Sequence, residues 1–120
     1  MKDVYGVGNA IVDVIAEVDD EFLSEVSLEK GHMTLVDNEQ MAAIENKLSS
    51  APKKIMSGGS AANTIYAVQA FGGSTAYGCR LSDDSNGQHF FRDFSESGIS
   101  ISTLSPAKEG ATGQCLVLVT

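Results

Sequence analysis

The chain has 120 residues, of which 42% are hydrophobic and 20% are charged, a composition typical of one modest globular domain. Its formal net charge of −8 argues against a nucleic-acid-binding surface, and no apolar run is long enough to cross a membrane. The N-terminus lacks the apolar segment of a signal peptide, and the two cysteines, Cys79 and Cys115, form no CxxC pair. Together these features predict a cytoplasmic protein with reduced thiols.

Strand and helix patterns alternate along the chain. In chain order, hydrophobic periodicity predicts a buried strand at residues 4–8, a strand at 11–18, a short helix at 20–26, a strand at 33–36, a helix at 38–48, a strand at 54–56, a helix at 61–71, a strand at 74–79, a helix between Gly87 and Gly98, and strands at 99–104 and 115–119. Such alternation indicates an α/β fold with a largely parallel sheet. The helix at 38–48 has the clearest start, because Asp37 and Gln40 match a capping box.

The strand at 11–18 differs from the other strands. Its even-numbered residues form one apolar face, and Asp13 lies on the opposite face, which is only partly apolar. A sheet that is covered on both sides does not suit such a strand. We therefore expect a small one-sided sheet outside the main core.

The glycine stretch from Ser57 to Thr64 is the most informative segment. Ser60 is a favourable N-cap for the helix that follows, and the two glycines before it let backbone N–H groups come close to a ligand. Asn63, in the first turn, would direct its amide to the same place. The segment predicts a polar pocket suited to hydroxyl groups or anions, and a glycine turn before an ordinary buried helix is the alternative.

Two common nucleotide-binding motifs are missing from the sequence. Residues 6–11 begin like a dinucleotide-binding loop, but Ile11 replaces the third glycine, and the residues after it alternate like a strand. The chain also contains neither GxxxxGKS nor GxxxxGKT. The sequence therefore predicts neither a Rossmann nor a Walker-type site.

Several short motifs follow one another in a recognisable order. They are Gly6-Val7-Gly8-Asn9 with Asp13, Asp20 to Leu23, Ser27-Leu28, Gly58-Gly59-Ser60 with Asn63, and Ala111 to Cys115. In this order and spacing they resemble the ribokinase-like (PfkB) family of carbohydrate and nucleoside kinases, and within that family the adenosine kinases. The resemblance extends along nearly the whole chain.

The resemblance implies the N-terminal part of a three-layer α/β/α fold with a small β-sheet lid. Lid strands are expected near residues 9–18, 31–37 and 111–116. Members of the family are much longer than this chain, and the chain stops within a strand pattern. We therefore expect residues 1–120 to be the N-terminal portion of a kinase domain, with the C-terminal ATP-binding portion absent.

The resemblance also implies which residues bind the acceptor. Asp13, Asn9, Gly58, Gly59 and Asn63 match sugar-binding positions, and the two oxygens of a carboxylate can accept bonds from two neighbouring ribose hydroxyls. Further lid positions match residues that bracket a nucleoside base or lie in the returning lid segment, with ordinary core packing as the alternative: Ile11, Met33, Leu35 and Cys115. No catalytic residue and no metal ligand are expected in this chain. The turn Asp83-Asp84 with Gly87 matches a family turn, in which we expect helix capping.

The implied activity is ATP-dependent phosphoryl transfer to a primary hydroxyl of a ribose-containing nucleoside, with adenosine as the first candidate. This chain would supply the acceptor-binding half and be inactive alone, while ATP and Mg²⁺ would bind mainly to the missing part. The expected partner is a small nucleoside or sugar, not a nucleic acid or a membrane, and a homodimer through the lid edge is compatible with the family. The alternatives are a ribose- or fructose-type sugar kinase, a non-catalytic nucleoside- or sugar-binding module, and an interaction protein that has lost its ligand.

Overall fold

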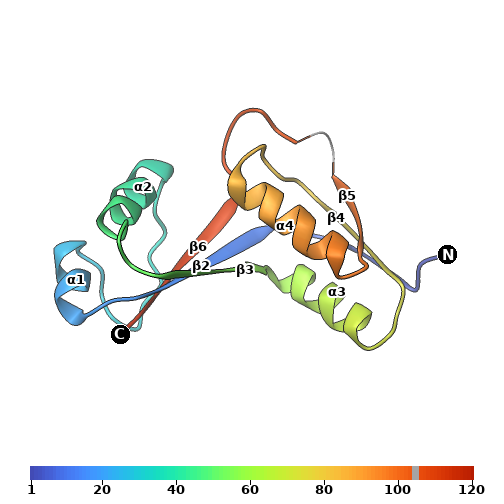
Figure 1. Ribbon diagram of the computed structural model, residues 1–120, viewed down its shortest axis with the longest axis horizontal. Coiled ribbons are helices and arrows are strands. Elements are labelled where there is room, and N and C mark those ends of the chain that lie inside the picture. Colours follow the sequence, from blue (N-terminus) through green and yellow to red (C-terminus); the bar gives the residue numbers. More distant parts are fainter. Residues whose placement is uncertain (104–105) are drawn as a thin grey trace. The chain divides into compact units, whose positions relative to one another are not determined.

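The computed structural model describes residues 1–103 and 106–120, so Leu104, the end of one predicted strand, lies outside the described residues. The elements follow one another as β1 (Val4–Val7), β2 (Ile11–Glu17), α1 (Asp20–Glu25), α2 (Asn38–Lys47), β3 (Lys53–Gly58), α3 (Ser60–Ala70), β4 (Thr75–Cys79), α4 (Ser85–Glu96), β5 (Ser100–Thr103) and β6 (Gly113–Val119) (Figure 1). The predicted alternation of strands and helices is confirmed. Among the described residues, no helix is both long and apolar enough to span a bilayer.

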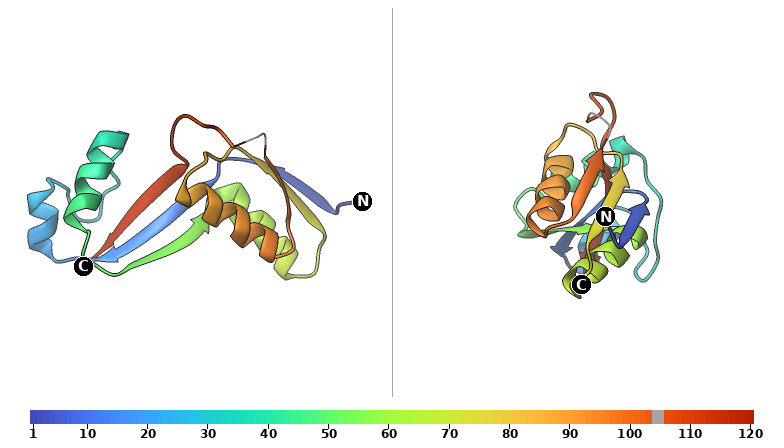
Figure 2. Two further views of the ribbon diagram at one scale, coloured as in Figure 1. Left: turned by 45° about the horizontal axis from the view of Figure 1, so that its top comes forward. Right: turned by 90° about the vertical axis from the view of Figure 1, so that its right-hand side faces the viewer.

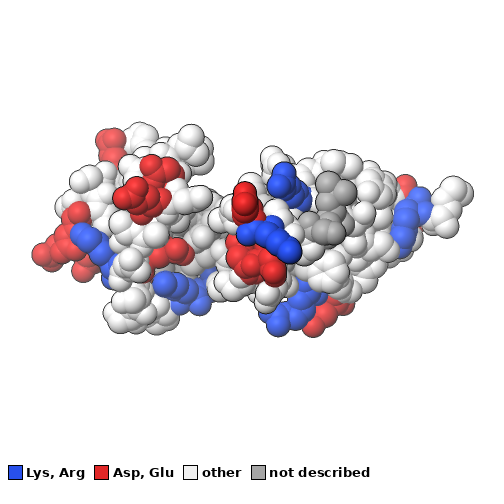
Figure 3. All heavy atoms as spheres, turned by 90° about the horizontal axis from the view of Figure 1, so that it is seen from above, with Lys and Arg blue, Asp and Glu red and all other residues white. Residues whose placement is uncertain are grey.

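The strands form two three-stranded sheets, with orders β1-β4-β5 and β3-β2-β6. In the first sheet, β4 pairs in parallel with both β1 and β5. The chain divides into two compact units: the first contains residues 1–13 and 55–115, and the second contains residues 14–54 and 116–120. On the face of the molecule shown in Figure 3, Lys and Arg side chains are scattered among acidic ones and form no single basic patch.

The core of the first unit is aromatic. α3 packs on β1 and β4, α4 packs on β5, and the two helices lie side by side (Figure 2). Tyr77 of β4 and two phenylalanines of α4, Phe90 and Phe94, are almost fully buried. The Phe90 and Phe94 rings stack with their centroids 4.4 Å apart, and the Phe94 ring lies 5.6 Å from that of Tyr77. Such pairs add to the stabilisation that burial of the rings already gives.

β1 forms as a strand, but the prediction that it is buried is wrong. Tyr5 is 60% exposed and Val7 is 74% exposed. Among the described residues β1 pairs with β4 alone, so it is an edge strand and its other side has no neighbouring described strand. Apolar sequence alone therefore does not bury a strand.

The second unit has its own small core. Ala16 of β2 packs with Ile44 and Leu48, and apolar residues of α1 and β6 pack against this cluster. The predicted capping box of α2 is confirmed, because the Gln40 N–H donates to the Asp37 carboxylate (2.8 Å) and the Asp37 N–H donates to the Gln40 side chain (3.0 Å).

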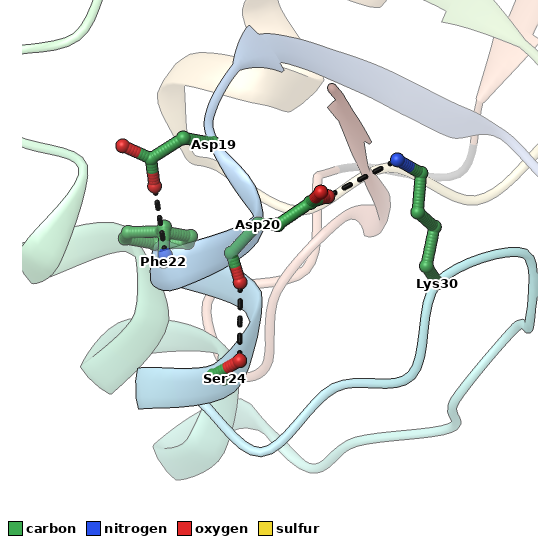
Figure 4. A network of polar contacts seen from close by, with 5 residues as sticks. All are labelled: Asp19, Asp20, Phe22, Ser24 and Lys30. Atoms are coloured by element: carbon green, nitrogen blue, oxygen red, sulfur yellow. Dashed lines mark hydrogen bonds and ion pairs between the residues drawn. The ribbon is translucent and has the colours of Figure 1, made fainter.

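The helix α1 begins with a similar cap. The Phe22 N–H donates to the Asp19 carboxylate (2.8 Å), and the Ser24 hydroxyl donates to the Asp20 carbonyl oxygen (3.1 Å) (Figure 4). Lys30 forms an ion pair with the Asp20 carboxylate at 3.1 Å, with both side chains mostly exposed. This pair contributes little to stability, because water screens it; the start of α1 depends mainly on Asp19.

The predicted lid strand near residues 31–37 is wrong. No strand forms over residues 32–37, and the third strand of the β3-β2-β6 sheet is β3 instead. Met33 and Leu35 alternate with polar residues as a strand would, but they are 93% and 96% exposed. A segment with an alternating pattern does not become a strand unless a neighbouring strand pairs with it.

Candidate functional site

The turn between β3 and α3 carries the glycine stretch. Gly59 is the N-cap residue of α3, with φ of +106°, and it supplies no side-chain cap. The prediction that Ser60 is the N-cap is wrong, because Ser60 is already the first residue of the helix. Since glycine has no side-chain oxygen, the first N–H groups of α3 have no side-chain acceptor at the N-cap and can donate to a ligand.

Asp13 lies directly against this turn. A Cβ atom built on Gly58 would be 2.7 Å from Asp13 Oδ2 and 3.2 Å from its carboxyl carbon. Gly58 is buried and Asp13 is partly buried. The carboxylate of Asp13 therefore occupies the space that any other residue at position 58 would fill with its side chain.

Asn9 lies close to the next residue of the same turn, Gly59. A Cβ atom on Gly59 would lie 2.7 Å from the Asn9 carbonyl oxygen, which also accepts a bond from the Tyr77 hydroxyl (3.2 Å). Asn63 is one turn into α3, and its backbone N–H donates to the Gly59 carbonyl (2.8 Å). The side chains of both asparagines are exposed, so their amide groups are accessible.

These contacts define the Asp13 cluster, which consists of Asn9, Asp13, Gly58, Gly59 and Asn63. The structure brings the Asp13 carboxylate, the Asn9 backbone and an uncapped helix start together within the first unit, with Asn63 in the first turn of that helix. The carboxylate can only accept hydrogen bonds when ionised, whereas the backbone N–H groups only donate. Such an arrangement can bind a ligand with several hydroxyl groups, each of which both donates and accepts.

β6 borders the cluster beside β2. A Cβ atom on Gly113 would lie 2.9 Å from the Ala10 carbonyl oxygen and 3.6 Å from the Ile11 side chain. Burial and the neighbouring charge of Asp13 both raise the pKa of the Cys115 thiol. Ile11 is partly buried and Cys115 is exposed, so these two predicted positions lie at the edge of the cluster without belonging to the core.

Met33 and Leu35 lie in the second unit. Their exposure excludes core packing within the described part of the chain. Their predicted contact with a nucleoside base stays a prediction.

Asn63 also lines a pocket of about 370 Å³ that does not include Asp13. The lining residues come from β3, α3 and α4: Ile55, Met56, Ser57, Asn63, Tyr66, His89, Asp93 and Phe94. The buried hydroxyl of Ser57 has no hydrogen-bond partner among the described residues. Sequence analysis did not indicate this pocket, because its residues come from three elements and share no motif.

The described residues contain no group of three or more histidine, cysteine, aspartate or glutamate side chains that could hold a metal ion. Asp84 caps α4 as expected, through a bond from the Gly87 N–H (2.7 Å). It also binds Thr112, a contact that sequence analysis missed.

Residues 33–120 match the profile described as pfkB family carbohydrate kinase. The chain belongs to the pfkB family. The match confirms the family predicted from the motifs, although it begins after the Gly6 to Asp13 segment.

Two solved structures share this pfkB fold with 34% sequence identity and cover 99% of the chain. They are a probable sugar kinase from Rhizobium etli CFN 42, with a TM-score of 0.81, and an adenosine kinase from Sinorhizobium meliloti, with a TM-score of 0.79. Adenosine kinase 2 of Arabidopsis thaliana is 26% identical over 117 residues, which cover 93% of the chain. The chain spans 34% of the plant protein and 36% of each bacterial protein, or about a third of these relatives. The predicted ribokinase-like α/β fold is thereby confirmed.

Proposed function

We propose that the protein to which this chain belongs is an ATP-dependent kinase that phosphorylates a primary hydroxyl of a ribose-containing acceptor, with adenosine as the first candidate. This chain supplies the acceptor-binding half. The observation that carries the proposal is the position of the Asp13 carboxylate against Gly58, next to the uncapped start of α3. A ribose presents two adjacent hydroxyls that suit the two carboxylate oxygens.

The Asp13 cluster would act by positioning the acceptor. Phosphoryl transfer depends mainly on alignment and on stabilisation of charge, so a firmly held ribose directs its primary hydroxyl toward the phosphate donor. Asp13 would accept bonds from the ribose hydroxyls. The amides of Asn9 and Asn63 and the first N–H groups of α3 would form the remaining hydrogen bonds to the acceptor. None of these groups needs to exchange a proton with the substrate.

In this proposal ATP supplies the phosphoryl group, and Mg²⁺ neutralises the charge of its phosphates. Both would bind mainly to parts of the protein outside this chain, which spans about a third of the relatives described above. Residues 1–120 alone would then have no kinase activity. A cytoplasmic location and a homodimer through the lid edge stay predictions.

A variant of Asp13 tests the proposal. In the full-length protein, Asp13→Ala should raise the KM for adenosine about 10- to 100-fold, because a hydrogen bond to a charged group contributes about 1.5–3 kcal/mol. The matched control is Glu17→Ala, which removes an exposed carboxylate from the end of the same strand and should leave the KM unchanged. An unchanged KM and kcat in Asp13→Ala would refute the role of this carboxylate.

A free-sugar kinase is the second candidate, because the Rhizobium etli relative at the same 34% identity is described as a probable sugar kinase. Rates with adenosine, ribose and fructose at matched concentrations separate the two candidates.

Met33→Ala sharpens the comparison: if Met33 contacts a base, the change raises the KM for adenosine but not for ribose. Since its side chain is 93% exposed, the same change should not alter stability. Acceptor binding without ATP-dependent phosphorylation by the full-length protein would instead identify a binding module.

A further inference from the structure

The residues just before β6 are tied to the start of α4. Asp84 Oδ2 accepts a bond from the Thr112 N–H (2.8 Å), and Oδ1 accepts bonds from the Thr112 hydroxyl (2.7 Å) and the Gly87 N–H (2.7 Å). The Thr112 hydroxyl in turn accepts a bond from the Ser82 N–H (3.1 Å). We call these four residues the Asp84 cluster; in it Thr112 is only 4% exposed.

The Asp84 cluster is closely packed. A Cβ atom on Gly87 would overlap the Ser82 carbonyl oxygen and lie 2.8 Å from the Thr112 hydroxyl. A second contact lies two residues further along β6, where the Asn86 amide donates to the Gln114 side chain (3.3 Å). Thr112 and Gln114 therefore both face α4.

Gly113 and Cys115 alternate with these two residues along the strand and have different neighbours. Gly113 lies against the Ala10 carbonyl oxygen, and Cys115 is close enough to Asp13 to respond to its charge. The Asp84 cluster thus fixes a strand that borders the residue proposed to bind the acceptor. All of these residues belong to the first unit.

We infer that Asp84 and Thr112 are positioning residues for the acceptor site: they hold the start of β6 beside β2, so that Asp13 keeps its place against Gly58. The inference rests on the proposed function, because it concerns binding of the same acceptor. The competing explanation is that Asp84 only caps α4. Capping alone requires the bond from Gly87 and makes no use of the two bonds from Thr112.

Four variants of the full-length protein separate these explanations. Thr112→Val removes the hydroxyl but keeps the shape of the side chain, whereas Thr112→Ser keeps the hydroxyl. Asp84→Ser keeps a favourable N-cap but is too short to serve both Gly87 and Thr112. Asp83→Asn is the control, because Asp83 is the exposed neighbour of Asp84.

The first readout is the KM for the acceptor. Thr112→Val and Asp84→Ser should raise it about tenfold with little change in kcat, because small displacements of a positioning group weaken binding. Thr112→Ser and Asp83→Asn should behave like the wild type. A lower melting temperature with an unchanged KM in Thr112→Val and Asp84→Ser would show a merely structural role and overturn the inference.

The second readout does not depend on the proposed function. Release of the β6 start should move the already exposed Cys115 thiol away from Asp13, whose charge raises the pKa of the thiol, so that more thiolate forms. Alkylation by iodoacetamide at pH 8 should then become at least about threefold faster in Thr112→Val, whereas Thr112→Ser should react like the wild type. Cys79 is the internal reference, because burial raises its pKa to about 11 and keeps it protonated. Equal Cys115 rates in the wild type and Thr112→Val would overturn the inference.

If the wild type phosphorylates neither adenosine nor ribose, the proposed function fails, while the thiol rates still decide whether Asp84 and Thr112 hold β6.

Discussion

Two helices of the first unit begin in opposite ways. α3 begins after Gly59, which offers no side-chain acceptor, so no side-chain bond caps its first turn. α4 begins after Asp84, whose carboxylate accepts bonds from Gly87 and Thr112 and has no oxygen left without a protein partner. The same kind of backbone terminus is thus left open at one helix and closed at the other.

The difference shows why a helix start by itself does not indicate function. At α3 the N–H groups without a side-chain cap lie next to the Asp13 carboxylate, a combination that suits a hydroxylated ligand. At α4 both oxygens of the Asp84 carboxylate accept hydrogen bonds from the protein, and in the inference above these bonds help to position β6. Changes at each helix start should therefore affect different measurements.

The largest effect on stability is expected for Gly59→Ala. This glycine has φ of +106°, and an added Cβ atom would meet the Asn9 carbonyl oxygen, a backbone atom that cannot turn away. We expect a loss of about 3 kcal/mol in the free energy of unfolding, since such a conformation alone costs a residue with a side chain about 1–3 kcal/mol. Urea unfolding of the full-length variant measures it. A variant as stable as the wild type would show that the start of α3 tolerates a side chain.

Gly58→Ala should affect binding more than folding. The added Cβ atom would meet the carboxylate of Asp13, which can rotate away at little cost to the fold. We expect the KM for the acceptor to rise about 10- to 30-fold, in line with the loss of hydrogen bonds to a charged group. The control is Ser57→Ala, which removes a buried hydroxyl that has no partner among the described residues and should neither raise the KM nor lower stability. If Gly58→Ala binds the acceptor normally, the position of Asp13 against Gly58 is unimportant for binding.

The smallest effect is expected for Asp84→Ala. Loss of the cap should lower the free energy of unfolding by about 1–2 kcal/mol near neutral pH. Burial of the Asp84 carboxyl group raises its pKa, but the bonds from Thr112 and Gly87 outweigh burial, so the pKa in the folded protein is lower than its usual value.

The direction of this shift fixes the pH dependence. Because the folded-state pKa is depressed, the stabilisation by Asp84 is present above the unfolded-state pKa of about 3.9 and is lost as the pH falls through the folded-state value. The difference in stability between the wild type and Asp84→Ala should be constant from about pH 5 to 8 and shrink below about pH 4. A difference that grows as the pH falls would contradict this assignment.

Local sequence features were predicted well where a short segment contains all of its own partners. The capping box of α2 is complete within residues 37–40, and the structure confirms both of its bonds. The helix of residues 61–71 is likewise close to the observed α3, Ser60–Ala70. The strand predicted at 33–36 is wrong, because pairing requires a neighbouring strand that no local pattern can guarantee.

The candidate site was predicted only in part. Gly58, Gly59 and Asn63 were selected from the pattern of the glycine stretch, and Asn9 and Asp13 through the resemblance to a family. The structure places these backbone segments together; the binding role of the residues stays a prediction. The choice between Gly59 and Ser60 as N-cap could not be made from the sequence, because both residue types occur at that position. The positive φ at position 59 and the nearby Asn9 carbonyl oxygen, which a Cβ atom would meet, favour glycine there.

The sequence by itself determined the family, the order of strands and helices, and the residues with the chemistry to bind a hydroxylated ligand. These properties depend on periodicity and on motifs whose residues are close in the chain. Only the tertiary structure decided that Asp13 meets Gly58 and that Asp84 meets Thr112, which is 28 residues away. The reason is physical, because contacts between distant segments depend on how strands pair and helices pack. An aspartate looks the same in the sequence whether its carboxylate stays accessible or is bonded to other parts of the protein.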